Sequence, residues 1–222
     1  MAAPATIRNQ RERELVEATR ALFDERGMQD APIEEIARAV GINKALIYRV
    51  FASKEELFVL TVTHYLEELR AVALAPAEAG EPEARLRVAC DRFTRFCLRY
   101  PAFLDCALSL MRRPAAELRE RVSEGVWLRL GRSMAACLAP LAAILADGKR
   151  RGAFAIEDPD FTANRLYTQV LGTMHLARVG AGVREAAPGV PDVFVLAPEQ
   201  VRLACIDDAL ALARITRAPS VT

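Results

Sequence analysis

Several features that mark other classes of protein are scarce in this sequence. Across 222 residues the net charge is only +1, and the first fifty residues carry as many acidic as basic side chains. Bulk positive charge therefore cannot hold nucleic acid, and any such binding must depend on where individual cations point. No uninterrupted apolar run reaches the roughly 18 residues of a membrane span, and the N-terminus lacks the pattern of a signal peptide. We expect a cytoplasmic protein without a membrane segment.

The residue patterns that usually carry enzyme chemistry or bind metals are also missing. The sequence has no G-x-S-x-G, no phosphate-loop glycine pattern and no H-E-x-x-H. Its two histidines, His64 and His175, fall on different expected helices without an acidic partner at ligand spacing. The cysteines are odd in number and form no C-x-x-C pair, which argues against a disulfide framework and a zinc site. We expect each to be a small buried side chain: Cys90, Cys97, Cys106, Cys137 and Cys205. The sequence thus predicts no catalytic site, metal or cofactor, and a protein that is not an enzyme.

Alanine and leucine supply much of the apolar content. Apolar residues make up 52% of the chain and aromatic residues only 6%, a balance that favours helices. We expect an all-α protein with two domains, residues 1–55 and 56–222, joined by a helix that continues to about residue 72. At the N-terminus we expect a disordered arm over residues 1–6 and a helix over residues 7–26, capped by Thr6 and ended by Gly27.

The stretch from Ile33 to Glu56 predicts two short helices joined at a glycine and a third helix that follows at once. Pro32 suits the first turn of the first helix, because its missing N–H would be unpaired there anyway. Gly41 makes the turn between the two helices. Ser53 and Glu56 occupy the reciprocal positions of a capping box, which starts the third helix.

The short helix expected over residues 44–51 has two unlike faces at a period of about 3.6 residues. Asn43 is a suitable N-cap for it. Its apolar side consists of Leu46, Ile47, Val50 and Phe51. Because a helix this short is not stable alone, that side must pack against neighbours. The other side presents two cations, a phenol and one small side chain, which suits contact with nucleic acid: Lys44, Ala45, Tyr48 and Arg49.

The order of these features resembles the N-terminal DNA-binding domain of TetR-family transcriptional regulators. The resemblance covers roughly residues 8–58 and is carried by Gly27, Gly41, Tyr48, Phe51 and the motif Ser53-Lys54-Glu55-Glu56-Leu57. It implies that the helix over residues 43–50 enters the major groove of DNA, where Lys44 and Ala45 meet base edges. It also implies that Tyr48 and Lys54 contact phosphates. The candidate DNA-binding residues are Asn43, Lys44, Ala45, Tyr48, Arg49 and Lys54.

Two positions depart from the family's pattern. Ala31-Pro32 stands where the family usually has threonine or serine, so a common phosphate-contacting hydroxyl is absent. Leu46 stands where threonine is frequent, and it either joins the edge of the core or touches a thymine methyl group.

The rest of the chain predicts a larger helical bundle that binds a ligand and dimerises. A connector of small residues over 73–82 precedes it, and residues 180–197, rich in glycine and proline, are expected to be irregular. Lys149-Arg150-Arg151 is interpreted as a solvated helix end. Gly125, Gly131 and Pro140 predict a kink or split in the long central helix. We expect helices over residues 83–100, 102–111, 114–149, 159–179 and 198–217.

Aromatic, methionine and histidine side chains recur on separate helices of this bundle. Such residues are more often core than ligand contacts, but bundles do hold ligands between helices, and the resemblance implies an inducer cavity. Its candidate lining residues are Phe93, Phe96, Cys97, Phe103, Met111, Trp127, Met134, Tyr167, Leu171, Met174 and His175. Apolar walls suit a small acyl or aromatic effector. Five arginines either bind a charged group of that effector or form a solvated face, which we favour: Arg92, Arg95, Arg99, Arg112 and Arg113.

The last expected helix is apolar almost all round, so it needs cover on two sides. Its own domain supplies one cover, and a second copy of the protein is the simplest other. We therefore expect a homodimer that pairs through the helices at residues 159–179 and 198–217. The sequence predicts a ligand-responsive, sequence-specific regulator of transcription, most simply a repressor that binds a pseudo-palindromic operator in double-stranded DNA. Two alternatives stay open: a small-molecule carrier or enzyme with a vestigial helix-turn-helix, and a non-specific architectural DNA binder.

Overall fold

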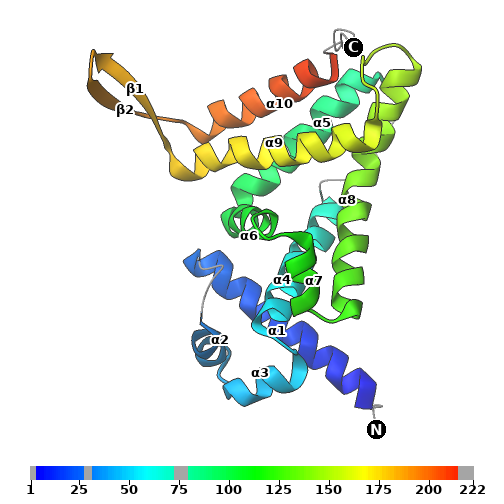
Figure 1. Cartoon of the computed structure of the whole chain (residues 1–222), viewed down its shortest axis with the longest axis vertical. Coiled ribbons are helices and arrows are strands. Elements are labelled where there is room, and N and C mark those ends of the chain that lie inside the picture. The colour runs from blue at the N-terminus through cyan, green and yellow to red at the C-terminus, as the bar shows by residue number, and fades with distance from the viewer. Residues whose placement is uncertain (1–3, 28–31, 73–79, 215–222) are drawn as a thin grey trace. The chain divides into compact units, whose positions relative to one another are not determined.

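The structure, a computed structural model, describes residues 4–27, 32–72 and 80–214 (Figure 1). Its helices in that part of the chain are α1 (Pro4–Arg26), α2 (Ile33–Val40), α3 (Lys44–Val50), α4 (Lys54–Val72), α5 (Pro82–Arg99), α6 (Pro101–Met111), α7 (Ala115–Arg121), α8 (Glu124–Arg150), α9 (Pro159–Val179) and α10 (Pro198–Arg214). Two strands, β1 (Ala181–Ala187) and β2 (Val190–Val195), form one antiparallel hairpin. The predicted all-α class is confirmed, with this small hairpin added.

The chain divides by packing into two compact units. Unit 1 comprises residues 1–68 and 100–134, and unit 2 comprises residues 69–99 and 135–222. The helices α4 and α8 each contribute residues to both units. These units are defined by packing, whereas the predicted boundary after residue 55 separates a DNA-binding from a ligand-binding domain. That functional boundary stays a prediction.

In unit 1 a network of polar side chains joins α1 and α4 to the start of α6. The Tyr65 hydroxyl donates to Asp24 Oδ1 at 2.6 Å, and the Tyr100 hydroxyl donates to Glu68 Oε1 at 2.6 Å. The Arg20 guanidinium pairs with Glu68 and lies 4.4 and 5.1 Å from the centroids of the two tyrosine rings. Burial and the bond to Asp24 raise the pKa of Tyr65, so the phenol stays protonated. Paired polar networks of this kind favour one packing arrangement.

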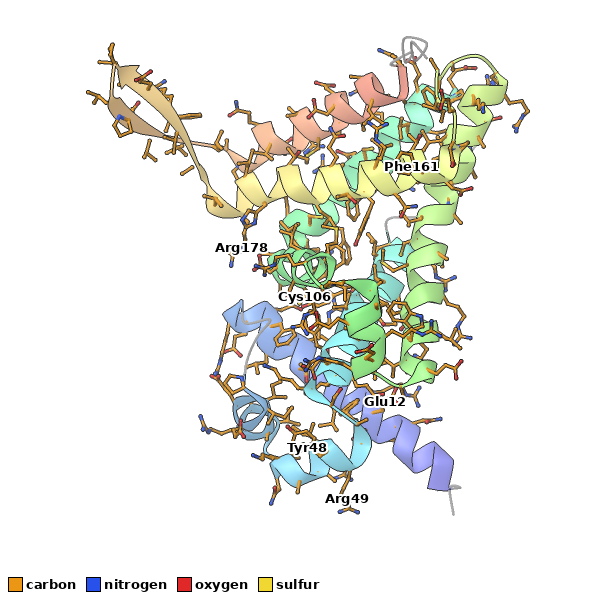
Figure 2. All side chains as sticks on the ribbon, viewed as in Figure 1. Glu12, Tyr48, Arg49, Cys106, Phe161 and Arg178 are labelled. Carbon is orange, nitrogen blue, oxygen red and sulfur yellow. The ribbon has the colours of Figure 1, made fainter. Side chains whose placement is uncertain are left out.

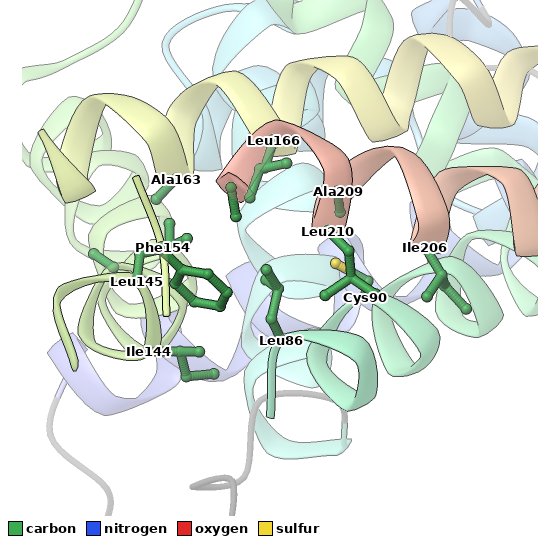
Figure 3. Packing of buried hydrophobic residues seen from close by; sticks show 12 residues of the cluster. Leu86, Cys90, Ile144, Leu145, Phe154, Ala163, Leu166, Ile206, Ala209 and Leu210 are labelled. Atoms are coloured by element: carbon green, nitrogen blue, oxygen red, sulfur yellow. The ribbon is translucent and has the colours of Figure 1, made fainter. Parts of the chain in front are cut away.

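The core of unit 2 lies where α10 packs against α5 and α9, together with the C-terminal part of α8 (Figure 3). The Phe154 ring occupies the space beside Gly148, where a Cβ atom would lie only 2.0 Å from the ring. The buried Arg202 on α10 pairs with Asp91 on α5. The clustered residues are Leu86, Cys90, Ala142, Ile144, Leu145, Phe154, Ala163, Leu166, Ile206, Ala209, Leu210 and Ala213.

Two predicted helix boundaries were wrong. The first helix begins at Pro4, so Thr6 lies inside α1 and is not its cap. The long central helix is split, as predicted, but at residues 122–123, where Val122 is extended, and not at Pro140. Ser123 N–H donates to Glu56 Oε1 at 2.8 Å, which pairs the first donor of the new helix. Residues 1–3, Ala31, most of the connector and the predicted helix end at 215–217 lie outside the described residues.

The segment over residues 180–197 was predicted to be irregular, and this was wrong. Residues 181–195 form the β1–β2 hairpin, in which Ala187 pairs with Val190 across Pro188-Gly189. Gly189 has a φ of +77°, which a turn of this Pro-Gly type requires and glycine adopts readily. The overlooked signal was a Pro-Gly pair followed by the valine-rich stretch Val190–Val195.

One helix of the described part of the chain, α8, is long and apolar enough to cross a membrane by length and composition. Its sequence includes Arg129 and Arg132 well inside both ends. Arg129 forms an ion pair with Glu12, while Ile144 and Leu145 belong to the core of unit 2. Both ends of α8 thus contact other parts of the protein, while 22% of its apolar window is buried.

Candidate nucleic-acid interface and apolar cavity

The helices α2 and α3 form a helix-turn-helix whose turn depends on one glycine. Gly41 has a φ of +69°, a left-handed conformation that glycine adopts at little cost. The N–H groups of Gly41 and Ile42 donate to the carbonyls of Arg38 at 3.1 Å and Ala37 at 2.9 Å. These bonds satisfy the last carbonyls of α2 and direct the chain into α3.

The two faces predicted for α3 are confirmed. Ile47 and Phe51 are buried with 0% and 1% of their surface exposed. Asn43 caps the helix, since its side chain accepts a hydrogen bond from Ala45 N–H at 2.9 Å. The exposed residues are Lys44, Ala45, Tyr48 and Arg49, which we call the outward face of α3. In Figure 2 the Arg49 side chain points away from the ribbon.

Lys44 has a partner that sequence reasoning missed. Its Nζ donates to Glu34 Oε1 on α2 at 2.7 Å, and both side chains are about half exposed. The hydrogen bond raises the pKa of Lys44 and lowers the pKa of Glu34, so both are charged at neutral pH. The charge of Lys54 also contributes to lowering the pKa of Glu34. Glu34 and Lys44 are ten residues apart on different helices, so the sequence alone does not show that they meet. The geometry of the turn at Gly41 brings them together.

The capping box at the start of α4 is present in a modified form. Ser53 Oγ accepts from Glu56 N–H at 3.0 Å, as predicted. The buried Glu56 carboxylate accepts from Ala52 N–H at 2.8 Å and also from Ser123 N–H at 2.8 Å. Ser53 Oγ donates in turn to the carbonyl of Arg121 at 2.8 Å. Within unit 1 this cap ties the start of α4, next to α3, to the junction between α7 and α8.

Unit 2 contains a small apolar cavity. Its volume is about 40 Å³, and its lining residues are Leu69, Ala89, Cys90, Phe93, Cys137, Leu138, Leu141, Leu166, Tyr167 and Val170. The only polar groups among these side chains are one phenol and two thiols. Burial raises the pKa of Cys90 to about 12, that of Cys137 to about 11, and also the pKa of Tyr167. All three groups are therefore neutral at physiological pH, and the cavity wall suits an uncharged, apolar guest.

The predicted ligand-contacting residues are divided between the two units. Phe93 and Tyr167 line the cavity, with ring centroids 5.7 Å apart. Four others are buried in unit 2 outside the lining: Phe96, Cys97, Leu171 and Met174. His175 is exposed on α9. The remaining four belong to unit 1, where Met111 is exposed: Phe103, Met111, Trp127 and Met134.

Most of the lining was missed because it consists of leucine, alanine, valine and cysteine. On α8, Cys137, Leu138 and Leu141 recur at helical spacing, but that pattern marks any buried face. The five cysteines are all buried, as predicted. Among the described residues, no three histidine, cysteine or acidic side chains come close enough to hold a metal ion.

The basic clusters outside the helix-turn-helix are solvated. Arg92, Arg95, Arg99 and Arg112 are exposed, and Arg113 lies with its guanidinium 5.6 Å from the centroid of the Phe58 ring. The basic segment at the end of α8, Lys149-Arg150-Arg151, is likewise exposed, and its side chains bind nearby acceptors. Lys149 Nζ donates to the Glu157 carbonyl at 2.6 Å, and Arg151 pairs with Glu81 at 2.7 Å. Lys149-Arg150-Arg151 is therefore a solvent-exposed helix end whose charges have partners within the protein.

Solved structures share this fold along most of the chain. PfmR from Thermus thermophilus superposes with a TM-score of 0.59 at 23% identity, covering 89% of this chain and 97% of PfmR. RolR in complex with resorcinol gives 0.61 at 17% identity over 96% of this chain and 91% of RolR. AibR in complex with isovaleryl coenzyme A and operator DNA gives 0.59 at 18% identity over 89% and 97%. At these identities the likeness concerns the fold alone.

The sequence similarity is concentrated in the helix-turn-helix. Residues 15–60 match the family of bacterial regulatory proteins, tetR family. The transcriptional regulator BetI of Brucella abortus is 34% identical over 77 residues, which make up 34% of this chain and only 39% of that regulator. The helix-turn-helix of this chain is therefore that of the TetR family of bacterial transcriptional regulators.

Proposed function

We propose that this protein is a ligand-responsive, sequence-specific DNA-binding regulator that acts as a symmetric dimer, most simply as a repressor in the cytoplasm. The observation that carries the proposal is the outward face of α3. A capped helix of seven residues is held by the buried Ile47 and Phe51, and it presents two cations and a phenol to solvent. In an electrically balanced chain such a face concentrates the positive charge at one short surface.

The proposal gives Lys44 one role in binding DNA and gives Tyr48, Arg49 and Lys54 another. In a dimer the two α3 helices enter successive major grooves about 34–36 Å apart on a pseudo-palindromic operator. Lys44 donates to a base edge, best to guanine O6 and N7, which requires it to leave or share Glu34. Tyr48, Arg49 and Lys54 contact phosphates and fix the position of the helix on the duplex.

The dimer is proposed to form through α9 and α10. Exposed large apolar side chains on these helices support it: Phe161, Leu176, Val179 and Leu203. Isolated apolar side chains on a surface are common, but several on two adjacent helices are a plausible basis for an interface.

The proposed effector is a small acyl or aromatic molecule that binds in the cavity of unit 2. The cavity of about 40 Å³ holds only a few water-sized spheres, so any such effector must widen it. Binding then favours the widened state by as much as the effector prefers it, and release from DNA follows if that state positions the two α3 helices wrongly. The ligands of RolR and AibR, resorcinol and isovaleryl coenzyme A, support these two chemical classes.

Selection of bound DNA from a random pool at physiological salt tests the proposal against its rivals. A regulator enriches one pseudo-palindromic motif. General retention of DNA without a motif would indicate an architectural binder instead. No retention would indicate a carrier or enzyme whose helix-turn-helix is vestigial, and either result would contradict the proposal.

A further inference from the structure

The β1–β2 hairpin, which joins α9 to α10, has one face covered by its own side chains. The Phe194 ring lies over Gly182, where a Cβ atom would come within 2.5 Å of the ring. Arg184 donates to Asp192 at 2.7 Å, and its guanidinium lies 5.5 Å from the Phe194 centroid. Side chains alternate between the faces of a strand, so Val190, Asp192 and Phe194 of β2 share this face, on which Val190 itself exposes 52% of its surface.

The opposite face is open to solvent and carries four apolar side chains at the end next to α9 and α10, with Glu185 and Pro191 nearer the turn. Ala181 pairs with Val195 and Val183 pairs with Val193, and we call these four residues the valine face. The three valines expose 73% (Val183), 67% (Val193) and 86% (Val195) of their surface. A two-stranded hairpin is marginally stable alone in water, and here one of its two faces has no cover within the described residues.

We propose that the valine face is an arm that packs against the second copy of this chain in the dimer. The inference rests on the proposed function, because it requires that dimer. Figure 1 shows the hairpin extending directly from the ends of α9 and α10. The last turn of α9 exposes Leu176 and Val179, so exposed apolar side chains continue from the proposed dimer helices onto the hairpin.

The size of the valine face identifies its occupant. Three valines and an alanine offer at most a few hundred Å², whereas a stable interface buries roughly 800 Å² on each partner. A protein that bound only here would be held weakly. The occupant must therefore also be held elsewhere nearby, and a second copy already paired through α9 and α10 meets that condition. In a two-fold dimer each copy contributes the same arm, which doubles the added contact.

Threonine substitutions test the arm without disturbing the hairpin. The variant V183T/V193T/V195T keeps the shape and strand preference of the side chains but removes their apolar character. Val190→Thr makes the same kind of change at one exposed valine of the other face and serves as the control. We expect the triple variant to raise the dimer dissociation constant roughly tenfold or more in sedimentation, and the control to change it by less than about twofold.

Hydrogen exchange of the wild-type protein provides a measurement that needs no variant. The amides of β1 and β2 should exchange slowly where sedimentation shows dimer and faster on dilution to monomer. Equal exchange in both states would overturn the inference, and so would a triple variant that dimerises normally. In either case the proposed dimer itself would still hold. Loss of binding to phosphatidylglycerol vesicles by the triple variant, with dimerisation unchanged, would assign the face to a lipid surface and also overturn it. A wild-type protein that stays monomeric at every concentration would remove the proposed dimer together with its arm.

Discussion

The helix α3 in unit 1 and the cavity in unit 2 are built in opposite ways. Beneath α3 the packing is complete, with Ile47 and Phe51 almost fully buried, and the functional groups lie outside it. In unit 2 the candidate site is a gap of about 40 Å³ that the packing leaves unfilled, bordered by Phe93 and Val170. A substitution beneath α3 should therefore act through stability, whereas one at the cavity should act through the space available to a guest.

The largest expected effect is on stability, and the same substitution, phenylalanine to alanine, is compared beneath α3 and at the cavity. Phe51→Ala should lower the free energy of unfolding by about 3–5 kcal/mol, because it opens a new cavity beneath α3. Phe93→Ala should fall at the low end of that range, since its ring already borders empty space. Urea unfolding followed by circular dichroism measures both. Equal losses would mean that the cavity wall is packed as tightly as the support of α3.

The next effects concern Tyr48, on the outward face of α3, and Lys54, at the start of α4. Replacing Tyr48 or Lys54 by alanine should weaken binding to all DNA sequences, because a phosphate contact is lost. Lys54→Ala, which removes a positive charge, should also flatten the dependence of affinity on salt, whereas Tyr48→Ala should leave that dependence unchanged. Binding measured by fluorescence anisotropy at several salt concentrations gives the slope. An unchanged slope in Lys54→Ala would argue against phosphate contact by Lys54, and undiminished affinity in Tyr48→Ala would argue against contact by Tyr48.

Glu34 on α2, the partner of Lys44, supplies a further prediction. Glu34→Gln should raise DNA affinity several-fold at low salt, since the carboxylate both holds Lys44 at 2.7 Å and repels phosphates. Glu25→Gln, an exposed change at the end of α1, is the matched control and should have less effect. If the two variants bind DNA equally, the Lys44–Glu34 pair has no influence on binding.

These two regions also differ in how far the sequence predicts them. The faces of α3, its cap and its glycine turn follow from local rules, because each involves residues a few positions apart. The partner of Lys44 and the link from Glu56 to Ser123 depend on how distant segments meet, which no local pattern states. The cavity lining is harder still. Leu138 and Leu141 look like any core leucines, and only the full packing decides which of them border a gap.

A smaller effect tests whether the gap is real. Val170→Ile adds one methylene group at the cavity and should stabilise unit 2 by about 1 kcal/mol, since roughly 0.8 kcal/mol accompanies burial of a CH₂ group. Val201→Ile on α10, which is buried away from the cavity lining, should instead destabilise by about 1–3 kcal/mol through overpacking. Thermal unfolding of both variants measures the difference. Destabilisation by Val170→Ile would show that no usable space exists there.

The smallest expected effect concerns pH. Burial raises the pKa of Cys137 from its ordinary 9.0 to about 11, so the unfolded chain loses this proton at a lower pH than the folded chain. The associated stability is fully present below about pH 9 and is lost as the pH rises towards 11, by at most about 1.4 kcal/mol per pH unit. Urea midpoints at about pH 8 and pH 10 should therefore differ less in Cys137→Ala than in the wild type. An identical difference in both proteins would contradict burial of the thiol beside the cavity.

The central claim is that the outward face of α3 reads DNA sequence as one half of a dimer. Its most direct test compares the DNA that the wild type and Lys44→Ala each select from a random pool. The account predicts a pseudo-palindromic motif for the wild type. It also predicts that Lys44→Ala relaxes the preference at one symmetric position in each half-site and keeps the spacing between them. The same motif, equally sharp at every position in both proteins, would contradict base reading by Lys44. A wild-type motif with a single half-site would contradict the paired arrangement.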